Sequence, residues 1–259
     1  MYRYLVPLLC TLALPLTAYA QADPWADLGT PTPEAADTDA QTQAQDMILT
    51  VFYHELGHAL IDTMQLPVLG LEEDAADVLS VVLINELWDA ASAEAKLRAA
   101  AGFWATSAAE WEATGEAPYY GGVHSPDQRR YYTYVCLFYG ADPDARGELA
   151  ADLGLDPDRA ASCPHEFDLA AGSWGAFLDE LYEKGAGGSI TWIGDDSGND
   201  PFAQMLTDEV DYLNSVLTLP QPLTVTLDRC DEPNAYYDPS VVGVTMCTEL
   251  VEYAVSAAD

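Results

Sequence analysis

The run at residues 51–61 constrains this chain most, because it carries His-Glu-x-x-His inside an apolar segment. Residues 43–64 contain no proline, which predicts one continuous helix. Side chains four residues apart share a face of a helix, so His54 and His58 can bind one cation. Glu55 lies beside them, where it can hold a water bound to that cation. This arrangement is typical of zinc hydrolases.

Histidine pairs also occur on helices without a metal, so the pattern needs support from its context. Pro67 and Gly70 end the first helix, and a second helix is expected over residues 72–88. On that helix Glu73 and Asp77 are four apart and share a face. Glu73 can therefore complete the metal shell, while Asp77 accepts the outer N–H of a histidine ligand.

Glu72 competes with Glu73 for the position of third ligand. One turn after Glu72 lies Ala76, which cannot orient a histidine, so Glu73 is favoured and Glu72 remains open. These acids also suit the first turn of any helix, because carboxylates there complement the helix dipole. That alternative explains the acidity of the segment but not its pairing with the upstream histidines.

The N-terminal region has the features of a secretory signal at residues 1–20: a positive start, an apolar stretch and a small-x-small site ending at Ala20. Residues 21–45 are predicted to be a flexible leader. Residues 46–259 then form one domain with a sizeable core. No other apolar run approaches the length of a membrane span. We therefore expect an exported protein, periplasmic or extracellular, without membrane insertion.

Four cysteines lie outside the signal: Cys136, Cys163, Cys230 and Cys247. An even number in an oxidising compartment suggests two disulfides. The pairs closest in sequence, Cys136–Cys163 and Cys230–Cys247, are favoured, although the sequence permits three pairings. Zinc binding by these cysteines is disfavoured because there is no Cys-x-x-Cys pair.

The composition is strongly acidic, with 43 acidic against 9 basic residues and a net charge of −34. Such a surface repels nucleic acid and anionic membranes, so neither is an expected partner. An acidic run at residues 195–200 hints at calcium. Its spacing does not match the helix–loop–helix calcium pattern, so calcium is disfavoured there.

The remaining pattern predicts an α+β, mainly helical domain with a small sheet. Helices are expected over residues 90–114, 125–140 and 172–184, strands over 189–193, 223–227 and 241–245, and a helix at the C-terminus. Ser125 is expected to cap the helix that Pro126 opens. His124, just before it, can reach into a cleft and stabilise an oxyanion, or can be a capping or surface residue. His165 is interpreted as structural.

Several motifs together resemble the bacterial metallopeptidase family DUF4344. They are residues 52–61, 72–77 and 124–129, Cys136, Cys163-Pro164 and the block from Cys230 to Leu250. The resemblance implies a zinc-peptidase-like fold with a small sheet beside the His-Glu-x-x-His helix. In the family the cysteine-containing block precedes that helix, whereas here it lies within residues 201–259. The order of motifs therefore looks circularly permuted, which is tolerable because domain termini often lie close together.

The segment Asn234-Ala235-Tyr236-Tyr237 also resembles the edge strand of neprilysin-like zinc peptidases. That resemblance implies a strand over the active-site helix whose Asn234 and Ala235 contact the backbone of a peptide substrate. The alternative is that Asn234 and Asp238-Pro239 only shape a hairpin turn.

These observations predict a secreted zinc peptidase of the gluzincin type that acts on peptides or proteins. His54, His58 and Glu73 would bind Zn²⁺, Glu55 would act as general base, Asp77 would orient a histidine and His124 would assist the oxyanion. Two alternatives remain: a non-catalytic binding protein stabilised by zinc, and a zinc hydrolase acting on another substrate. The sequence does not indicate an oligomeric state.

Overall fold

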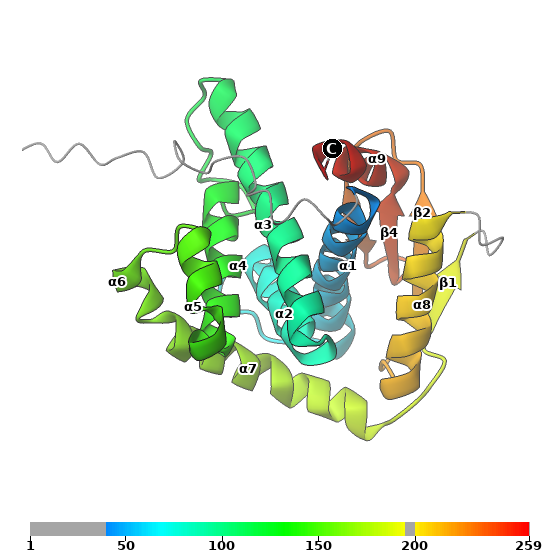
Figure 1. The fold of residues 1–259 in the computed structure, drawn as a ribbon. Coiled ribbons are helices and arrows are strands. Elements are labelled where there is room, and N and C mark those ends of the chain that lie inside the picture. Colours follow the sequence, from blue (N-terminus) through cyan, green and yellow to red (C-terminus); the bar gives the residue numbers. More distant parts are fainter. Residues whose placement is uncertain (1–39, 195–199, 259) are drawn as a thin grey trace, which may run out of the picture.

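The computed structural model describes residues 40–194 and 200–258. The predicted signal, most of the predicted leader and nearly all of the acidic run at 195–200 lie outside these residues. The described chain folds into a helical part and a part that contains a sheet (Figure 1). This is the mainly helical α+β fold that the sequence predicts.

The helical part contains five long helices: α1 (Ala40–Met64), α2 (Glu72–Leu87), α3 (Ala90–Ala113), α4 (Asp127–Ala141) and α7 (Cys163–Glu183). Two short helices join α4 to α7: α5 (Pro143–Asp152) and α6 (Pro157–Ala160). The second part contains β1 (Ile190–Ile193), α8 (Pro201–Val216), β2 (Leu223–Asp228), β3 (Ala235–Asp238), β4 (Gly243–Cys247) and α9 (Thr248–Ala258).

Helix α1 lies at the centre of the molecule and is buried on nearly all sides. It packs against α2, α3 and α9 and against the sheet (Figure 1). A helix that is apolar all round is stable only inside a core, which explains why the histidine motif lies in an apolar run. The helix begins at Ala40, so the prediction of a flexible leader is wrong for residues 40–45. Ala44 in that segment is buried, and its packing holds the first turns in the helix.

Helices α1 and α2 approach each other closely where Gly57 faces Ala76. A Cβ atom added at Gly57 would lie 3.0 Å from the Cα atom of Ala76, tighter than ordinary side-chain packing. The absence of a side chain at Gly57 therefore lets the start of α2 lie directly beside the histidines of α1.

The sheet has the strand order β1-β2-β4-β3, with β3 at one edge. Strands β1, β2 and β4 are parallel, whereas β3 is antiparallel to β4. Cys247 N donates to Asn234 O, so in the alternating antiparallel pattern Ala235 and Tyr237 direct their backbone polar groups away from β4. The segment around Asn234 therefore forms an edge strand and not only a turn, and this strand packs against α1.

Two local predictions differ from the structure. Helix α4 begins at Asp127 with Pro126 in the cap position and no side-chain cap, so Ser125 lies one residue too early to cap it. Helix α7 begins at Cys163 instead of residue 172. Pro164 does not interrupt it, because a backbone N–H in the first turn of a helix has no partner to lose.

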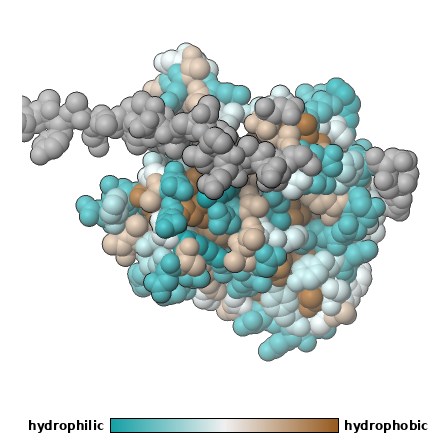
Figure 2. Space-filling model, viewed as in Figure 1, coloured by the Kyte–Doolittle hydropathy of each residue, from teal (hydrophilic) through white to brown (hydrophobic). Residues whose placement is uncertain are grey.

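Both predicted disulfides are present. Cys136–Cys163 joins α4 to the first residue of α7, and Cys230–Cys247 joins the loop before β3 to the end of β4. Hydrophilic residues are spread over the face shown in Figure 2, with more hydrophobic ones between them. Within the described residues, no helix is both long enough and apolar enough to cross a membrane.

Candidate metal centre

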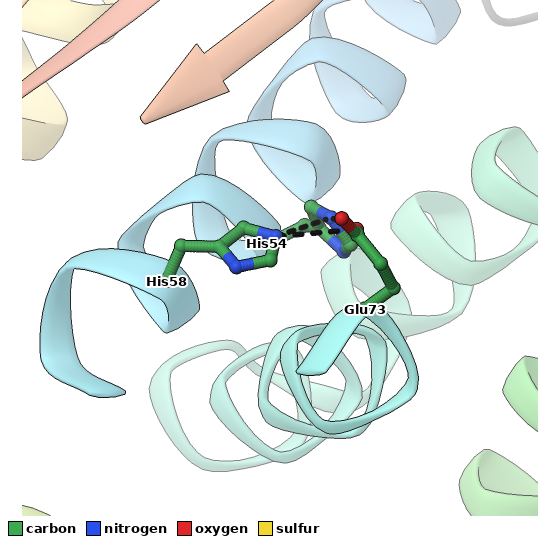
Figure 3. Close-up of side chains that lie close together, drawn as sticks. All are labelled: His54, His58 and Glu73. Carbon is green, nitrogen blue, oxygen red and sulfur yellow. Dashed lines mark hydrogen bonds and ion pairs between the residues drawn. The ribbon is translucent and has the colours of Figure 1, made fainter. Parts of the chain in front are cut away.

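Three side chains from α1 and α2 converge on one point (Figure 3). Glu73 Oε2 lies 3.2 Å from Nε2 of His54 and 3.2 Å from Nε2 of His58, and the two nitrogens are 3.2 Å apart. Donor atoms bound tetrahedrally at 2.0–2.1 Å would be about 3.3 Å from one another. The spacing therefore fits three donors of one small ion. It is the only such group of His, Cys, Asp and Glu found within residues 40–194 and 200–258.

A carboxylate holds the outer nitrogen of each imidazole. His54 Nδ1 donates to Asp77 Oδ1 at 2.8 Å, and His58 Nδ1 donates to Glu72 Oε1 at 2.8 Å. Both rings therefore present Nε2 to the centre. Neighbouring residues on a helix point about 100° apart, so Glu73 faces the ring nitrogens at the centre while Glu72 lies outside them. Glu72 thus does for His58 what Asp77 does for His54, a role that the spacing of residues within α2 does not indicate.

Asp77 belongs to a buried network that includes Arg130, a residue not singled out from the sequence. Arg130 binds both oxygens of Asp77, from Nε at 2.8 Å and from Nη2 at 2.7 Å, and its guanidinium lies 3.6 Å from the ring centre of Trp104. Tyr134 also donates to Asp77 Oδ1, at 3.2 Å. Burial raises the pKa of Asp77, but Arg130 and His54 outweigh it and lower the pKa to about 2. Asp77 is therefore a fixed anion behind His54.

The same contacts determine the charge of the metal-free site. Burial lowers the pKa of His54, but the hydrogen bonds to Asp77 and Glu73 outweigh it and raise the pKa to about 9. The pKa of His58 is also raised, because Glu73 and Glu72 outweigh its burial. Against its own burial, Glu73 has a pKa well below its usual range, owing to His124, His54 and His58. A metal ion must therefore displace protons from the histidines in order to bind.

Glu55 lies beside the histidines and is only 6% exposed. Burial raises the pKa of its carboxyl, and the neighbouring imidazoles reduce that effect only in part. The backbone N–H of Tyr237 on β3 also interacts with this carboxylate. Glu55 thus lies between the metal centre and the edge strand.

His124 reaches the centre from the loop before α4. Its Nε2 is 3.0 Å from Glu73 Oε2, and its side chain is 54% exposed. The structure therefore brings His124 to the site, in contact with a candidate ligand, although it is not one of the three converging groups. His165, which was interpreted as structural, does not contribute to the centre.

A cleft of about 1170 Å³ surrounds these residues, somewhat larger than the usual range for small-molecule pockets. One wall is β3, where Asn234, Ala235 and Tyr237 line the cleft. Tyr237 Oη donates to Asp62 Oδ2 at 2.7 Å and so ties the strand to α1. Beyond the histidines, towards the start of α1, the lining is largely apolar and includes Met47, Val51, Phe103, Trp104 and Leu250.

Some polar groups at the outer edge of β3 already have hydrogen-bond partners within the chain. Ala235 N donates to Asn234 Oδ1 at 2.9 Å, and Asn234 Nδ2 donates to Glu232 at 3.3 Å. Both residues predicted to contact substrate therefore lie at the cleft wall, and the backbone carbonyl of Ala235 points away from β4.

Comparison with known proteins adds a family but no individual relative. No curated protein and no solved structure matches the chain. The model of the family DUF4344, described as "Putative metallopeptidase", matches residues 19–178 and 201–258. A metallopeptidase family implies a bound metal, and the converging group of His54, His58 and Glu73 can supply its ligands. The match covers most of the sequence, and the chain therefore belongs to the DUF4344 family.

Proposed function

We propose that this protein is an exported zinc peptidase of the gluzincin type, in which His54, His58 and Glu73 hold the metal and Glu55 is the general base. The observation that carries the proposal is the convergence of two imidazole nitrogens and one carboxylate oxygen, 3.2 Å apart, beside a buried carboxylate in a large cleft. Two nitrogen donors and one oxygen donor suit zinc, and catalytic zinc sites use three protein ligands. When bound there, zinc would act as a Lewis acid that acidifies water and polarises a carbonyl.

Glu55 moves the proton in this proposal. Because burial raises its pKa, the carboxylate is a stronger base than an exposed glutamate. It takes the proton of the attacking water and passes it to the amine that leaves.

His124 supports the charge that develops on the carbonyl oxygen. Its imidazole reaches the centre from the solvent side, where it meets Glu73. A ring N–H in that position can donate to an oxyanion formed in the cleft.

The edge strand β3 holds the peptide substrate. An extended peptide can add to an open strand edge through main-chain hydrogen bonds. The outward carbonyl of Ala235 and the side chain of Asn234 are the groups that β3 offers at this wall. The bond to be cleaved then lies between β3 and the histidines of α1.

The test is the substitution Glu55→Gln, which keeps the size of the side chain and removes the base. We expect this variant to bind zinc like the unmodified protein and to hydrolyse peptides about 10²–10⁴-fold more slowly. Glu252→Gln, at an exposed position of α9, is the matched control and should leave the rate unchanged. Zinc content by metal analysis and cleavage of a diverse peptide library are measured together. A zinc-loaded, unmodified protein that cleaves no peptide would refute the proposal.

The contact between His124 and Glu73 also favours a second candidate, a non-catalytic binding protein. If His124 is a fourth protein ligand, the zinc site is closed and structural. The substitution His124→Ala separates the two: a peptidase should lose rate but keep its zinc affinity, whereas a closed structural site should lose affinity. A zinc hydrolase of another substrate class would show hydrolysis only in a wider substrate panel.

The proposal that the protein is exported is supported by the signal-like features of its N-terminal sequence. The two disulfides agree with it, because disulfides persist in oxidising compartments. Expression of the full-length chain in a bacterium with a signal peptidase should yield a mature protein that begins at Gln21. An N-terminus that still begins at Met1 would contradict this part of the proposal.

A further inference from the structure

Exposed apolar side chains gather in two loops beside the metal centre. Of the eleven large hydrophobic residues that are exposed among the described residues, five belong to these loops. Leu69 and Leu71 precede α2, and Tyr119, Tyr120 and Val123 precede α4. Leu69 is fully exposed, Tyr120 is 80% exposed and Val123 is 66% exposed. We refer to these five residues as the apolar rim.

The two loops meet at the metal centre. Leu71 lies two residues before Glu73 and Val123 directly before His124, and the contact between Glu73 and His124 is 3.0 Å long. Leu71 and Val123 both line the cleft. The ring of Tyr119 folds back over its own loop, since a Cβ atom at Gly121 would lie 2.9 Å from it. The apolar rim therefore borders the cleft at the side of His124.

Its position makes the apolar rim more than a set of scattered exposed residues. Single exposed hydrophobics are common, but a group at the mouth of a cleft marks a binding surface. The rest of the surface is strongly acidic, with a net charge of −34 over the chain. A polyanionic partner would be repelled, so the charge favours an apolar partner that is neutral or basic.

We propose that the apolar rim binds an apolar, extended segment of a polypeptide substrate, several residues away from the bond that is cleaved. This inference rests on the proposed peptidase function. An extended chain advances about 3.3 Å per residue, so a few extended residues can lead from β3 and the histidines to the rim. A segment that is folded in the substrate cannot follow this path. The substrates are therefore unfolded or disordered polypeptides with apolar segments, and short peptides use only part of the binding surface.

The test compares a long and a short substrate. The long one is a synthetic 30-residue peptide without acidic residues that carries Leu- and Phe-rich segments on both sides of a cleaved bond. The short one is its central octapeptide. The double variant Leu69→Ser/Tyr120→Ser removes two rim side chains that do not line the cleft. The matched control is Leu169→Ser/Tyr212→Ser, at exposed positions on α7 and α8.

We expect the rim variant to raise KM for the 30-residue peptide about tenfold, because two apolar contacts are lost. Its kcat for that peptide and its KM for the octapeptide should stay within about twofold of the unmodified values. The control variant should change neither substrate's KM. Equal KM values for the rim variant and the control with the long peptide would overturn the inference.

A binding measurement separates this inference from the proposed function. In the zinc-loaded Glu55→Gln background, the rim variant should weaken binding of the labelled 30-residue peptide, followed by fluorescence anisotropy, by the same factor. If the zinc-loaded protein with Glu55 intact cleaves no peptide, but the rim substitutions still weaken this binding, the peptidase is refuted and the rim is supported. If instead the rim variant loses binding only to neutral phosphatidylcholine vesicles and keeps its affinity for the peptide, the rim is a lipid surface and the inference is wrong.

Discussion

The two histidines of the centre differ in what stands behind them. His54 donates to Asp77, which is 2% exposed and is itself held by Arg130 and Tyr134. His58 donates to Glu72, whose side chain is 53% exposed. The distances are the same, 2.8 Å in both cases, but the surroundings are not.

This difference assigns separate tasks to the two sides of the site. The buried side is fixed by a charged network inside the core, where opposite charges interact strongly and an unpaired charge is costly. The exposed side is held by one solvated carboxylate, whose contact is weakened by water and salt. We infer that the position of the metal is set from the His54 side, while the His58 side adjusts to it. The following predictions, from the largest effect to the smallest, test this division.

Arg130→Met should have the largest effect, on stability. It leaves the buried Asp77 without its strongest partner, and breaking a buried pair in this way costs about 3–5 kcal/mol. Arg98→Met is the matched control, because the Arg98–Glu94 pair is exposed and should contribute less than about 1 kcal/mol. Urea unfolding of the metal-free proteins gives both values. Similar losses for the two variants would show that the network does not stabilise the fold.

Asp77→Asn should weaken the metal site more than any change on the exposed side. The amide keeps the shape of the side chain but removes the charge that holds the His54 ring, and loss of such an outer partner lowers metal affinity about 10–100-fold. Competition with a chelator for zinc measures the affinity. An affinity within twofold of the unmodified protein would remove the distinction between the two sides.

Metal affinity should also depend on pH. The pKa of His54 is raised to about 9 in the metal-free protein, so a proton occupies the ring below that pH and zinc must displace it. Each unit by which the pH falls below 9 should therefore cost about tenfold in zinc affinity through His54 alone, and more where His58, whose pKa is also raised, carries a proton as well. The folding stability of the metal-free protein should change with pH in the opposite direction to zinc affinity.

The raised pKa of His54 contributes folding stability at low pH, which is lost as the pH rises through 9. Chelator competition and urea unfolding at pH 6 to 9 measure the two trends.

Glu72→Gln should have the smallest effect. Its carboxylate is exposed, and the amide oxygen can still accept the hydrogen bond from His58 Nδ1. We expect zinc affinity to fall less than about threefold, and less at high salt. A loss as large as that of Asp77→Asn would mean that burial does not distinguish the two histidines.

The sequence predicted which candidate ligands lie close together, because the spacing of residues on a helix places them on common faces. Spacings of four residues placed His54 with His58 and Glu73 with Asp77 on common faces, and the structure brings these groups together. It did not identify Arg130, which reaches Asp77 from a helix more than fifty positions away. Such contacts depend on how helices cross, which no local pattern specifies. The role of Glu72 was missed for a similar reason: it depends on the direction of the His58 ring and not on a partner within α2.

The fold, too, could be predicted only where a local sequence pattern determines it. Elements with a clear local pattern were predicted within a few residues: α1 from its proline-free apolar run, α2 from its core stripe and β2 from its alternation. Boundaries were less accurate where packing overrides composition, as at residues 40–45, which join α1 because Ala44 is buried. The edge position of β3 was available only from a resemblance, since four residues that end in an aspartate carry little pattern of their own. The permuted order of motifs remains a prediction.

The contact at Gly57 makes this position a spacer between the two helices that carry the candidate ligands. A methyl group there would press on the backbone of Ala76, and Ala76 lies on the same helix as Glu73 and Asp77. Enlarging a residue that touches neither metal nor substrate would thus move one donor relative to the other two. A motif usually described by its histidines and glutamate therefore depends, in this chain, equally on the one residue among them that has no side chain.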